Sequence, residues 1–256
     1  MNKNFLNVKN LNFSHIKYGF FTRIGGKSKN NFSSLNCSIS SGDKITTVKK
    51  NIKTASKMII SNNQNLKLVK QLHSNKIIEI SKKNFNSELK GDGLITKDFS
   101  IALGVLTADC APIFVFDKKK NFICCLHAGW KGALLNISKK SINLIKKKYH
   151  KNLNDLVVII GPCLAKNNFE VSSIFKKKFI KSNIKYKKFF LKKNNKKYLF
   201  DMRGLINYQF KEMGIKKILN SKHDTYKNEK LFFSHRRSNH KNLTETGRMI
   251  NIVSFA

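Results

Sequence analysis

The chain has 256 residues, of which 41% are hydrophobic and 11% aromatic, which is enough for a full hydrophobic core and excludes a disordered chain. Its formal net charge of +37, from 51 Lys+Arg against 14 Asp+Glu, would suit nucleic acid, but lysine is spread along the whole chain beside abundant Asn, Ile and Phe. We therefore interpret the charge as drift of a solvated surface, and expect one globular domain over residues 1–256 without a nucleic-acid partner.

Hydrophobic periodicity predicts a mixed α/β domain. In the first hundred residues it predicts a strand at 18–22, a helix at 46–58, a strand at 66–72 and, after a glycine turn at 91–93, a strand at 94–96. Beyond these it predicts strands at 101–106, 113–116, 122–126, 156–160, 215–219 and 249–255, and helices at 133–149 and 200–213. The lysine-rich segment 176–197 is expected to form exposed helix and loop.

A hairpin is expected from the strands at 113–116 and 122–126, which flank polar residues 117–121. A two-residue loop at Lys118 and Lys119 would set Cys110 directly opposite His127, and a loop one residue longer would move the register by one position. In either case a thiol and an imidazole meet at the open end of one hairpin, close enough to share a metal ion.

His73, Cys110 and His127 each follow or end a predicted strand beside a turn, where side chains can face a cleft. Two imidazoles and a thiolate match the three protein ligands that a catalytic zinc site needs beside an open position. A second interpretation of the same residues is nucleophilic, with Cys110 as thiolate and His127 as base, as in cysteine hydrolases. Asp109 is a candidate general base, a residue supporting the ligand cysteine, or a carboxylate that stabilises the turn.

Arginine occurs at only five positions: Arg23, Arg203, Arg236, Arg237 and Arg248. Because lysine serves nearly every site that needs only positive charge, these positions are candidates for a planar, bidentate contact. Arg23 on its glycine turn, the pair Arg236 and Arg237, and Arg248 together suggest an anion site, unless they hold loops through backbone carbonyls.

No apolar run has the length of a membrane span or of a signal-peptide core, so we expect a cytoplasmic protein without a membrane partner. The five cysteines cannot all pair, and Cys124 and Cys125 point to opposite faces of one predicted strand. A disulfide framework is therefore not expected. Monomer and homodimer both remain open.

Seven short motifs in order resemble one protein family: F-T-R-I-G-G at 21–26, Q-L-H at 71–73, L-T-A-D-C-A-P at 106–112, H-A-G-W-K-G at 127–132, I-G-P-C at 160–163, F-F-S-H-R-R at 232–237 and T-G-R at 246–248. The chain resembles, over essentially its whole length, the bacterial purine nucleoside phosphorylases once described as polyphenol oxidases or laccase-domain proteins. The T-A-D-C and H-A-G-W elements are the most specific part of this match.

The resemblance implies a layered α/β/β/α fold with mixed sheets, related to toxin deamidases, and a zinc or copper site whose ligands match His73, Cys110 and His127. It also implies phosphorolysis of adenosine, inosine, guanosine and methylthioadenosine, with deamination of adenosine at the same site. The chain departs from the family pattern at Ser74, Lys131 and Asp224.

The older oxidase label fits the residues poorly, because seven histidines do not readily supply a blue-copper centre together with a multinuclear one. The non-enzymatic alternative is a basic RNA-binding protein, against which the sequence shows neither an RNP-like aromatic motif nor a clustered basic stripe.

Overall fold

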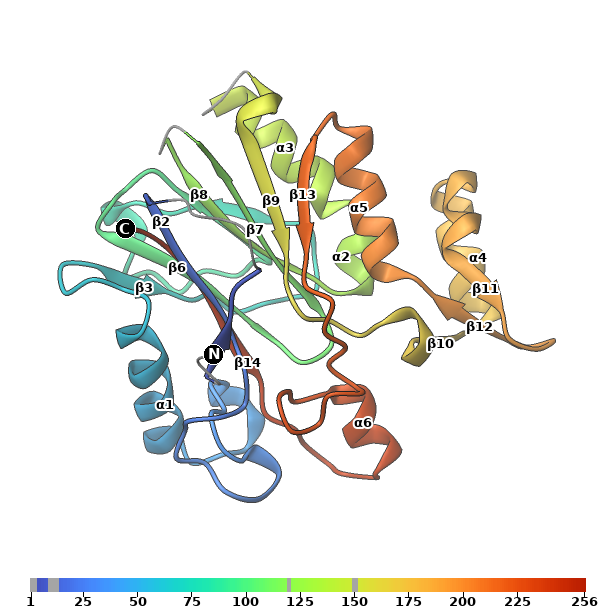
Figure 1. Cartoon of the computed structure of the whole chain (residues 1–256), viewed down its shortest axis with the longest axis horizontal. Coiled ribbons are helices and arrows are strands. Elements are labelled where there is room, and N and C mark those ends of the chain that lie inside the picture. Colours follow the sequence, from blue (N-terminus) through green and yellow to red (C-terminus); the bar gives the residue numbers. More distant parts are fainter. Residues whose placement is uncertain (1–3, 9–13, 119–120, 149–151) are drawn as a thin grey trace.

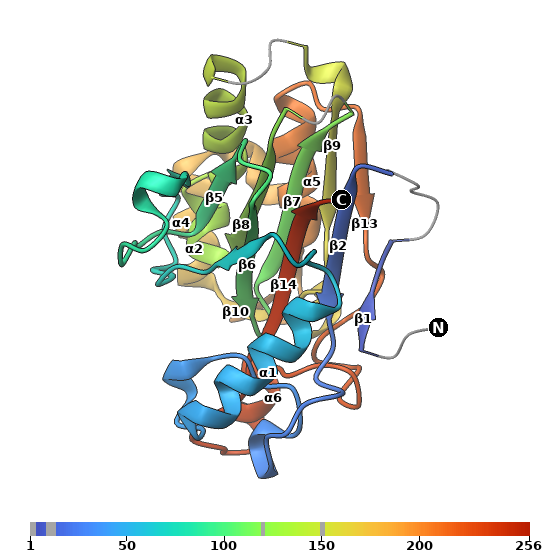
Figure 2. The same cartoon turned by 90° about the vertical axis from the view of Figure 1, so that its left-hand side faces the viewer.

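Two β-sheets packed face to face form the centre of the fold, and helices cover the outer face of each sheet (Figure 1). The computed structural model describes residues 4–8, 14–118, 121–148 and 152–256. Figure 2 shows the same arrangement turned by 90°, with α1 (Ile45–Lys57) in front of the sheets. The predicted α/β class and its layered mixed sheets are confirmed.

The first sheet holds both ends of the described chain. Its strands, in spatial order, are β1 (Phe5–Leu6), β2 (Ile16–Phe21), β14 (Met249–Phe255), β6 (Ile101–Thr107) and β3 (Asn65–Lys67). The second sheet runs in the order β13 (Lys217–Asn220), β9 (Leu156–Ile160), β7 (Ala111–Asp117), β8 (Ile123–Ala128), β5 (Gly93–Thr96) and β4 (Ile77–Glu79). Both sheets are mixed, because β3 pairs with β6, β13 with β9, and β4 with β5 in parallel, whereas the other pairs are antiparallel.

The two sheets share an aromatic and aliphatic core that alternate residues of their strands supply. At its centre the rings of Phe20 and Phe114 stack with centroids 4.6 Å apart and planes 9° apart. Both side chains are fully buried, and each such side chain contributes about 1.5–3 kcal/mol relative to leaving it exposed. This core fixes the relative positions of β6 and β7, and so also the two ends of the loop that joins them.

Helices bury one apolar stripe each against the outer sheet faces. Ala55 and Ile59, on and just after α1, pack on the first sheet with Phe21 and Ile252. The second sheet is covered by α2 (Trp130–Leu134), α3 (Ile137–Lys148) and α5 (Met202–Glu212). In the described residues no helix is long and apolar enough to cross a membrane.

A small third sheet forms the end of the molecule beyond α5. It consists of β10 (Glu170–Ser172), β12 (Lys197–Phe200) and β11 (Phe190–Lys192), with α4 (Ser173–Ser182) packed on it through Phe179. The remaining helix is α6 (His235–His240), and the 3-10 turns are η1 (Asn30–Phe32), η2 (Ile39–Ser41), η3 (Lys82–Asn84), η4 (Leu153–Asp155), η5 (Lys166–Asn168) and η6 (Ile184–Phe189).

Three sequence predictions of elements were wrong in part. The strand expected at 66–72 ends at Lys67, because the following residues turn toward Asp92. The helix expected at 133–149 is two helices, α2 and α3, since Asn136 adopts a left-handed φ of 54° between them, and position 149 lies outside the described residues. The segment 176–197 also contains β11, which the lysine content concealed.

The hairpin of β7 and β8 forms, but its register differs from the prediction. Pro112 pairs with His127 and Phe116 with Ile123, so Cys110 lies beyond the paired residues and not opposite His127. The loop is longer than expected because the Asp117 carboxylate accepts hydrogen bonds from the backbone and side-chain nitrogens of Asn121, at 2.9 and 2.6 Å. Lys119 of the expected two-residue loop lies outside the described residues.

Candidate metal and active site

His73, Cys110 and His127 converge on one point from three separate segments. His73 lies in the loop after β3, Cys110 in the loop between β6 and β7, and His127 on β8. One potential ligand atom of each lies within 4.8 Å of the others, and the two imidazole rings meet edge to face at a centroid distance of 4.9 Å. The structure thus brings together all three side chains that the sequence predicts as ligands.

The backbone around these residues is shaped to bring them together. His73 and Asp109 are non-glycine residues with left-handed φ angles of 56° and 83°, a conformation that is concentrated at functional sites. At Gly129 a Cβ atom would lie 2.9 Å from Sγ of Cys110 and 3.1 Å from Cδ2 of His73. Only glycine leaves that space to the two side chains.

Asp92 contacts two of the candidate ligands, and the sequence analysis did not identify it as a site residue. Its buried carboxylate accepts hydrogen bonds from Nδ1 of His127 at 2.8 Å, from the backbone N–H of His73 at 2.9 Å, and from both the backbone and the hydroxyl of Ser74 at 2.7 Å. One carboxylate therefore orients a candidate ligand and fixes the loop of another. The sequence feature that could have indicated Asp92 is its place between two glycines at the start of the buried strand β5.

The charges at the site support one another. Burial opposes ionisation of Cys110, but the positive charge and hydrogen bonds of the two histidines outweigh it and lower the pKa of the thiol to about 6. Burial also opposes protonation of His127, yet the neighbouring Cys110 and Asp92 raise the pKa of that imidazole to about 9. Burial acts against the Asp92 charge as well, but the hydrogen bonds from His127 and Ser74 hold the pKa of the carboxyl well below its usual range.

The Asp109 side chain faces residues 225–236, which end in the first turn of α6. Its carboxylate accepts hydrogen bonds from the hydroxyls of Thr225 at 2.6 Å and Ser234 at 3.0 Å and from the backbone N–H of Arg236 at 2.6 Å. Both carboxylate oxygens are thus engaged. Asp109 thereby ties the loop that carries Cys110 to the C-terminal part of the site. A carboxylate with both oxygens engaged is better suited to position this loop than to transfer a proton.

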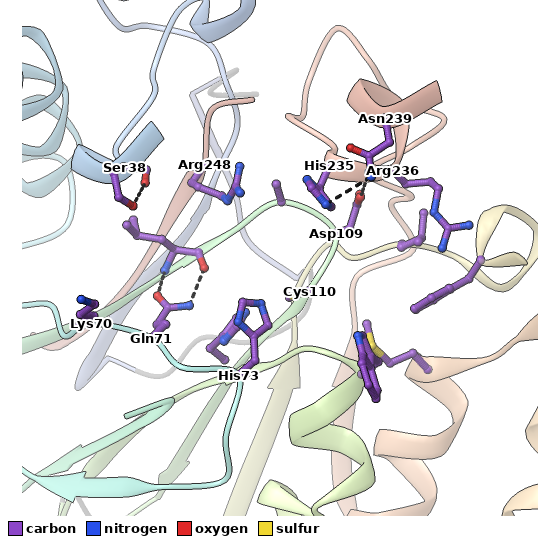
Figure 3. A pocket seen from close by; sticks show the side chains of 18 of the residues that line it. Ser38, Lys70, Gln71, His73, Asp109, Cys110, His235, Arg236, Asn239 and Arg248 are labelled. Carbon is purple, nitrogen blue, oxygen red and sulfur yellow. Dashed lines mark hydrogen bonds between the residues drawn. The ribbon is translucent and has the colours of Figure 1, made fainter. Parts of the chain in front are cut away.

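A cavity of about 720 Å³ opens onto the three candidate ligands (Figure 3). This volume lies within the range of about 300–1,000 Å³ that is usual for small-molecule sites. Its walls come from all parts of the chain: Ser38, Ser40, Val69, Lys70, Gln71, His73, Leu106, Ala108, Asp109, Cys110, His127, Trp130, Leu164, Phe169, Met202, His235, Arg236, Asn239 and Arg248. His235, which the sequence analysis did not single out, is exposed at its wall.

Of the four arginines predicted for an anion site, only Arg236 and Arg248 line this cavity. Arg23 lies in a separate hollow, where it donates to the carbonyl of Ser33 at 2.5 Å and stacks over Phe233. Arg237 is buried and donates to backbone carbonyls, including that of Thr225 at 2.7 Å. These two arginines stabilise loops, which was the alternative that the sequence left open.

The three departures from the family pattern have clear places in the structure. The Ser74 hydroxyl donates to Asp92, and Nζ of Lys131 lies 5.6 Å from the ring centroid of Trp130. The Asp224 carboxylate accepts hydrogen bonds from the Asn168 side chain and the Tyr226 backbone, at 2.5 and 2.9 Å, and does not line the cavity.

Comparison with known proteins identifies the family of the chain. The family described as multi-copper polyphenol oxidoreductase laccase matches residues 17–256. The chain belongs to this family. A purine nucleoside phosphorylase of Rickettsia conorii is 32% identical over 228 residues, which cover 88% of this chain and 90% of the relative. The purine nucleoside phosphorylase YlmD of Bacillus subtilis is 26% identical, covering 96% of this chain and 91% of the relative.

Solved structures share the whole fold. The hypothetical protein YfiH of Bacillus licheniformis matches with a TM-score of 0.86 and 25% identity, over 94% of this chain and 93% of that one. A Neisseria meningitidis protein, NMB0706, matches with a TM-score of 0.88 and 23% identity, over 98% and 99% of the two chains, and supports the fold alone. The family's copper-oxidase name and the His-Cys-His cluster both suggest metal binding.

Proposed function

We propose that the chain is a metal-dependent purine nucleoside phosphorylase that acts on adenosine, inosine, guanosine and methylthioadenosine and also deaminates adenosine at the same site. The observation that carries the proposal is the convergence of His73, Cys110 and His127 in a cavity that Arg236 and Arg248 also line. Relatives named purine nucleoside phosphorylase support the reaction class.

The donor set fits a zinc or copper ion. Two imidazoles and a thiolate are ligands that both metals accept, and the low pKa of Cys110 supplies the thiolate near neutral pH. When bound to these three residues, the ion would supply Lewis-acid chemistry that polarises the purine in phosphorolysis and acidifies water for deamination.

The side chains of the cavity would do the remaining work. A guanidinium group of the cavity wall, on Arg236 or Arg248, orients the phosphate, whose oxygen forms a bond to the sugar C1′ while the bond from C1′ to N9 breaks. The electron pair of that bond leaves with the purine, which takes up the proton that the hydrogen phosphate releases. Asp92 and Asp109 act as positioning residues, since their carboxylate oxygens are occupied by the groups that they hold.

Product identification tests this proposal. The purified protein is incubated with adenosine, with and without inorganic phosphate, and ribose 1-phosphate, adenine and inosine are quantified. Phosphate-dependent ribose 1-phosphate with a stoichiometric amount of free purine base is expected, together with slower formation of inosine. The same assay is run on inosine, guanosine and methylthioadenosine, the last of which would give 5-methylthioribose 1-phosphate. Absence of a sugar 1-phosphate product from all four nucleosides would rule the phosphorylase out.

A cysteine hydrolase is the second candidate, and one observation favours it. Cys110, His127 and Asp92 stand in the order of nucleophile, base and orienting carboxylate that cysteine hydrolases use. His73, which also donates to the Cys110 thiol, has no role in such a triad but has one in a metal site. Chelators would leave a hydrolase active and inactivate the phosphorylase.

A further inference from the structure

Figure 3 shows Ser38, Lys70 and Arg248 on one side of His73 and Cys110, and Arg236 on the other. We call the first side the polar end of the cavity and the side of Arg236, whose guanidinium lies over Phe169, the apolar end. Trp130, Leu164, Phe169 and Met202 form the apolar end and belong to, or pack against, the core between the second sheet and its helices. Trp130 and Phe169 both contact Phe175, with ring centroids at 5.2 and 6.3 Å, which places them in one aromatic group.

Asn36 organises the polar end. Its buried Oδ1 accepts hydrogen bonds from the backbone N–H groups of Ser38 at 3.1 Å and Arg248 at 3.0 Å, so these two residues are held side by side. The Ser38 hydroxyl lies 3.3 Å from that of Ser40, and Lys70 lines the same end. Figure 3 shows Ser38, Arg248 and Lys70 together on the side away from Arg236.

Arg248 is fixed by one nitrogen and open at the others. Its Nη1 donates to the carbonyls of Thr246 at 2.7 Å and Gly247 at 3.1 Å, while within the described residues its Nε and Nη2 have no hydrogen-bond partner. A guanidinium that is anchored in this way keeps a two-donor edge for an oxyanion without a further loss of side-chain freedom.

Arg236 is also anchored through Nη1, but it lies against an aromatic ring. Its Nη1 donates to the carbonyl of Glu170 at 2.9 Å, and its guanidinium carbon lies 5.4 Å from the ring centroid of Phe169. The guanidinium thereby extends the aromatic end with another planar surface, and bases stack on such planes as well as on aromatic rings.

We infer that the two substrates divide between these ends, with the purine base against Trp130, Phe169 and Arg236, and the phosphate on Arg248 with the hydroxyls of Ser38 and Ser40. This assignment rests on the proposed function and separates two arginines that the reaction alone leaves equivalent. It follows because an apolar wall would leave a phosphate dianion unsolvated, whereas stacking suits a purine. The reacting C1′ then lies between the ends, beside the candidate ligands.

Equilibrium binding tests the assignment without turnover. Calorimetry measures the Kd of adenine and of inorganic phosphate separately for the wild type, Arg248→Gln, Arg236→Gln, Phe169→Leu and, as a matched control outside the cavity, Arg23→Gln. Arg248→Gln should weaken phosphate binding at least about tenfold, because a charged hydrogen-bond pair is lost, and leave adenine within about twofold. Phe169→Leu should weaken adenine binding about fivefold or more and leave phosphate unchanged.

The remaining variants serve as controls for the two assignments. Arg236→Gln should leave phosphate binding unchanged, and Arg23→Gln should change neither Kd. Trp130 is the single tryptophan of the chain, so adenine should alter its fluorescence while phosphate alone should not. Weaker phosphate binding in Arg236→Gln than in Arg248→Gln, or weaker adenine binding in Arg248→Gln than in Phe169→Leu, would overturn the assignment. Normal binding of both ligands without phosphorolysis would instead refute the proposed function and leave the assignment standing.

Discussion

Oδ1 of Asp92 lies 2.8 Å from Nδ1 of His127, which leaves the other ring nitrogen of that histidine, Nε2, facing the Cys110 thiol. A hydrogen bond of this kind fixes both the tautomer and the orientation of a ligand imidazole. Because the same carboxylate holds the His73 backbone, one side chain prepares two of the three candidate ligands.

Asp92→Asn should therefore weaken zinc binding about 10–100-fold, the range seen when such outer partners of a metal ligand are lost. Asp98→Asn is the matched control, since Asp98 also accepts from the backbone and hydroxyl of a serine, Ser100, but does not line the cavity. Competition with a chromophoric chelator gives both affinities. Equal zinc affinity in wild type and Asp92→Asn would show that this carboxylate is not part of the site.

Gln71 joins the loop that carries His73 to β6, the strand that leads to Cys110. Its side-chain Nε2 donates to the Leu106 carbonyl at 2.9 Å, and its Oε1 accepts from the Leu106 N–H at 2.7 Å. The side-chain amide thus makes the two backbone hydrogen bonds that a neighbouring strand would make at this edge of β6. Gln71→Ala should lower the free energy of unfolding by about 1–2 kcal/mol, because two hydrogen bonds are lost, and should lower the metal content per folded chain severalfold.

The control for Gln71 lies at the other end of the same sheet. Gln64 donates to the carbonyls of Phe99 at 2.8 Å and Phe255 at 3.0 Å, far from the cavity along β6 and β14. Gln64→Ala should lower the melting temperature and leave metal content per folded chain unchanged. Equal metal loss in the two variants would mean that Gln71 acts only on general stability.

The pH dependence of alkylation reports the state of Cys110 in metal-free protein. Cys110 is the only partly exposed cysteine, while Cys37, Cys124, Cys125 and Cys163 are buried with raised pKa values. Since the pKa of Cys110 is lowered to about 6, its labelling by iodoacetamide should rise with pH through about 6 and then level off, well below the ordinary thiol value of about 8.5.

Peptide mass spectrometry locates the label. Zinc should suppress labelling of Cys110, and Asp92→Asn should move the midpoint upward because His127 loses the carboxylate that favours its charge. A midpoint near the ordinary thiol value in the metal-free wild type would contradict the thiolate.

The sequence predicted most of the fold because hydrophobic periodicity is local. The strands at 156–160 and 249–255 formed as expected, as did the helix near 46–58, whose residues Val48 and Ala55 are buried. It also predicted the three side chains that converge at the site. What it could not predict was the hairpin register, which Asp117 and Asn121 set through a side-chain contact, or the role of Asp92, which depends on loops distant in sequence.

The arginines show the same limit. Arginine is rare in this chain, and all four of the arginines predicted for an anion site donate to backbone carbonyls, but only Arg236 and Arg248 also line the cavity. Composition gives no information on which side of a loop a guanidinium lies, because tertiary packing decides it.

Asp109→Asn separates a positioning role from proton transfer. The asparagine amide keeps one acceptor oxygen but loses part of the hydrogen bonding with Thr225, Ser234 and the Arg236 N–H. The free energy of unfolding should therefore fall by about 1–3 kcal/mol. Phosphorolysis should slow, while the pH at which its rate is half-maximal stays unchanged. Loss of the acid limb of the pH profile would instead assign Asp109 as the base.

The central claim is that one metal ion on His73, Cys110 and His127 supports phosphorolysis. Its most direct test measures metal per chain and phosphate-dependent ribose 1-phosphate in the same preparations of wild type, Cys110→Ala and Cys124→Ala, the last altering a buried cysteine on the strand of His127. We predict about one metal ion per chain with activity in wild type and Cys124→Ala, and loss of both in folded Cys110→Ala. Full phosphorolysis by metal-free Cys110→Ala would contradict the account.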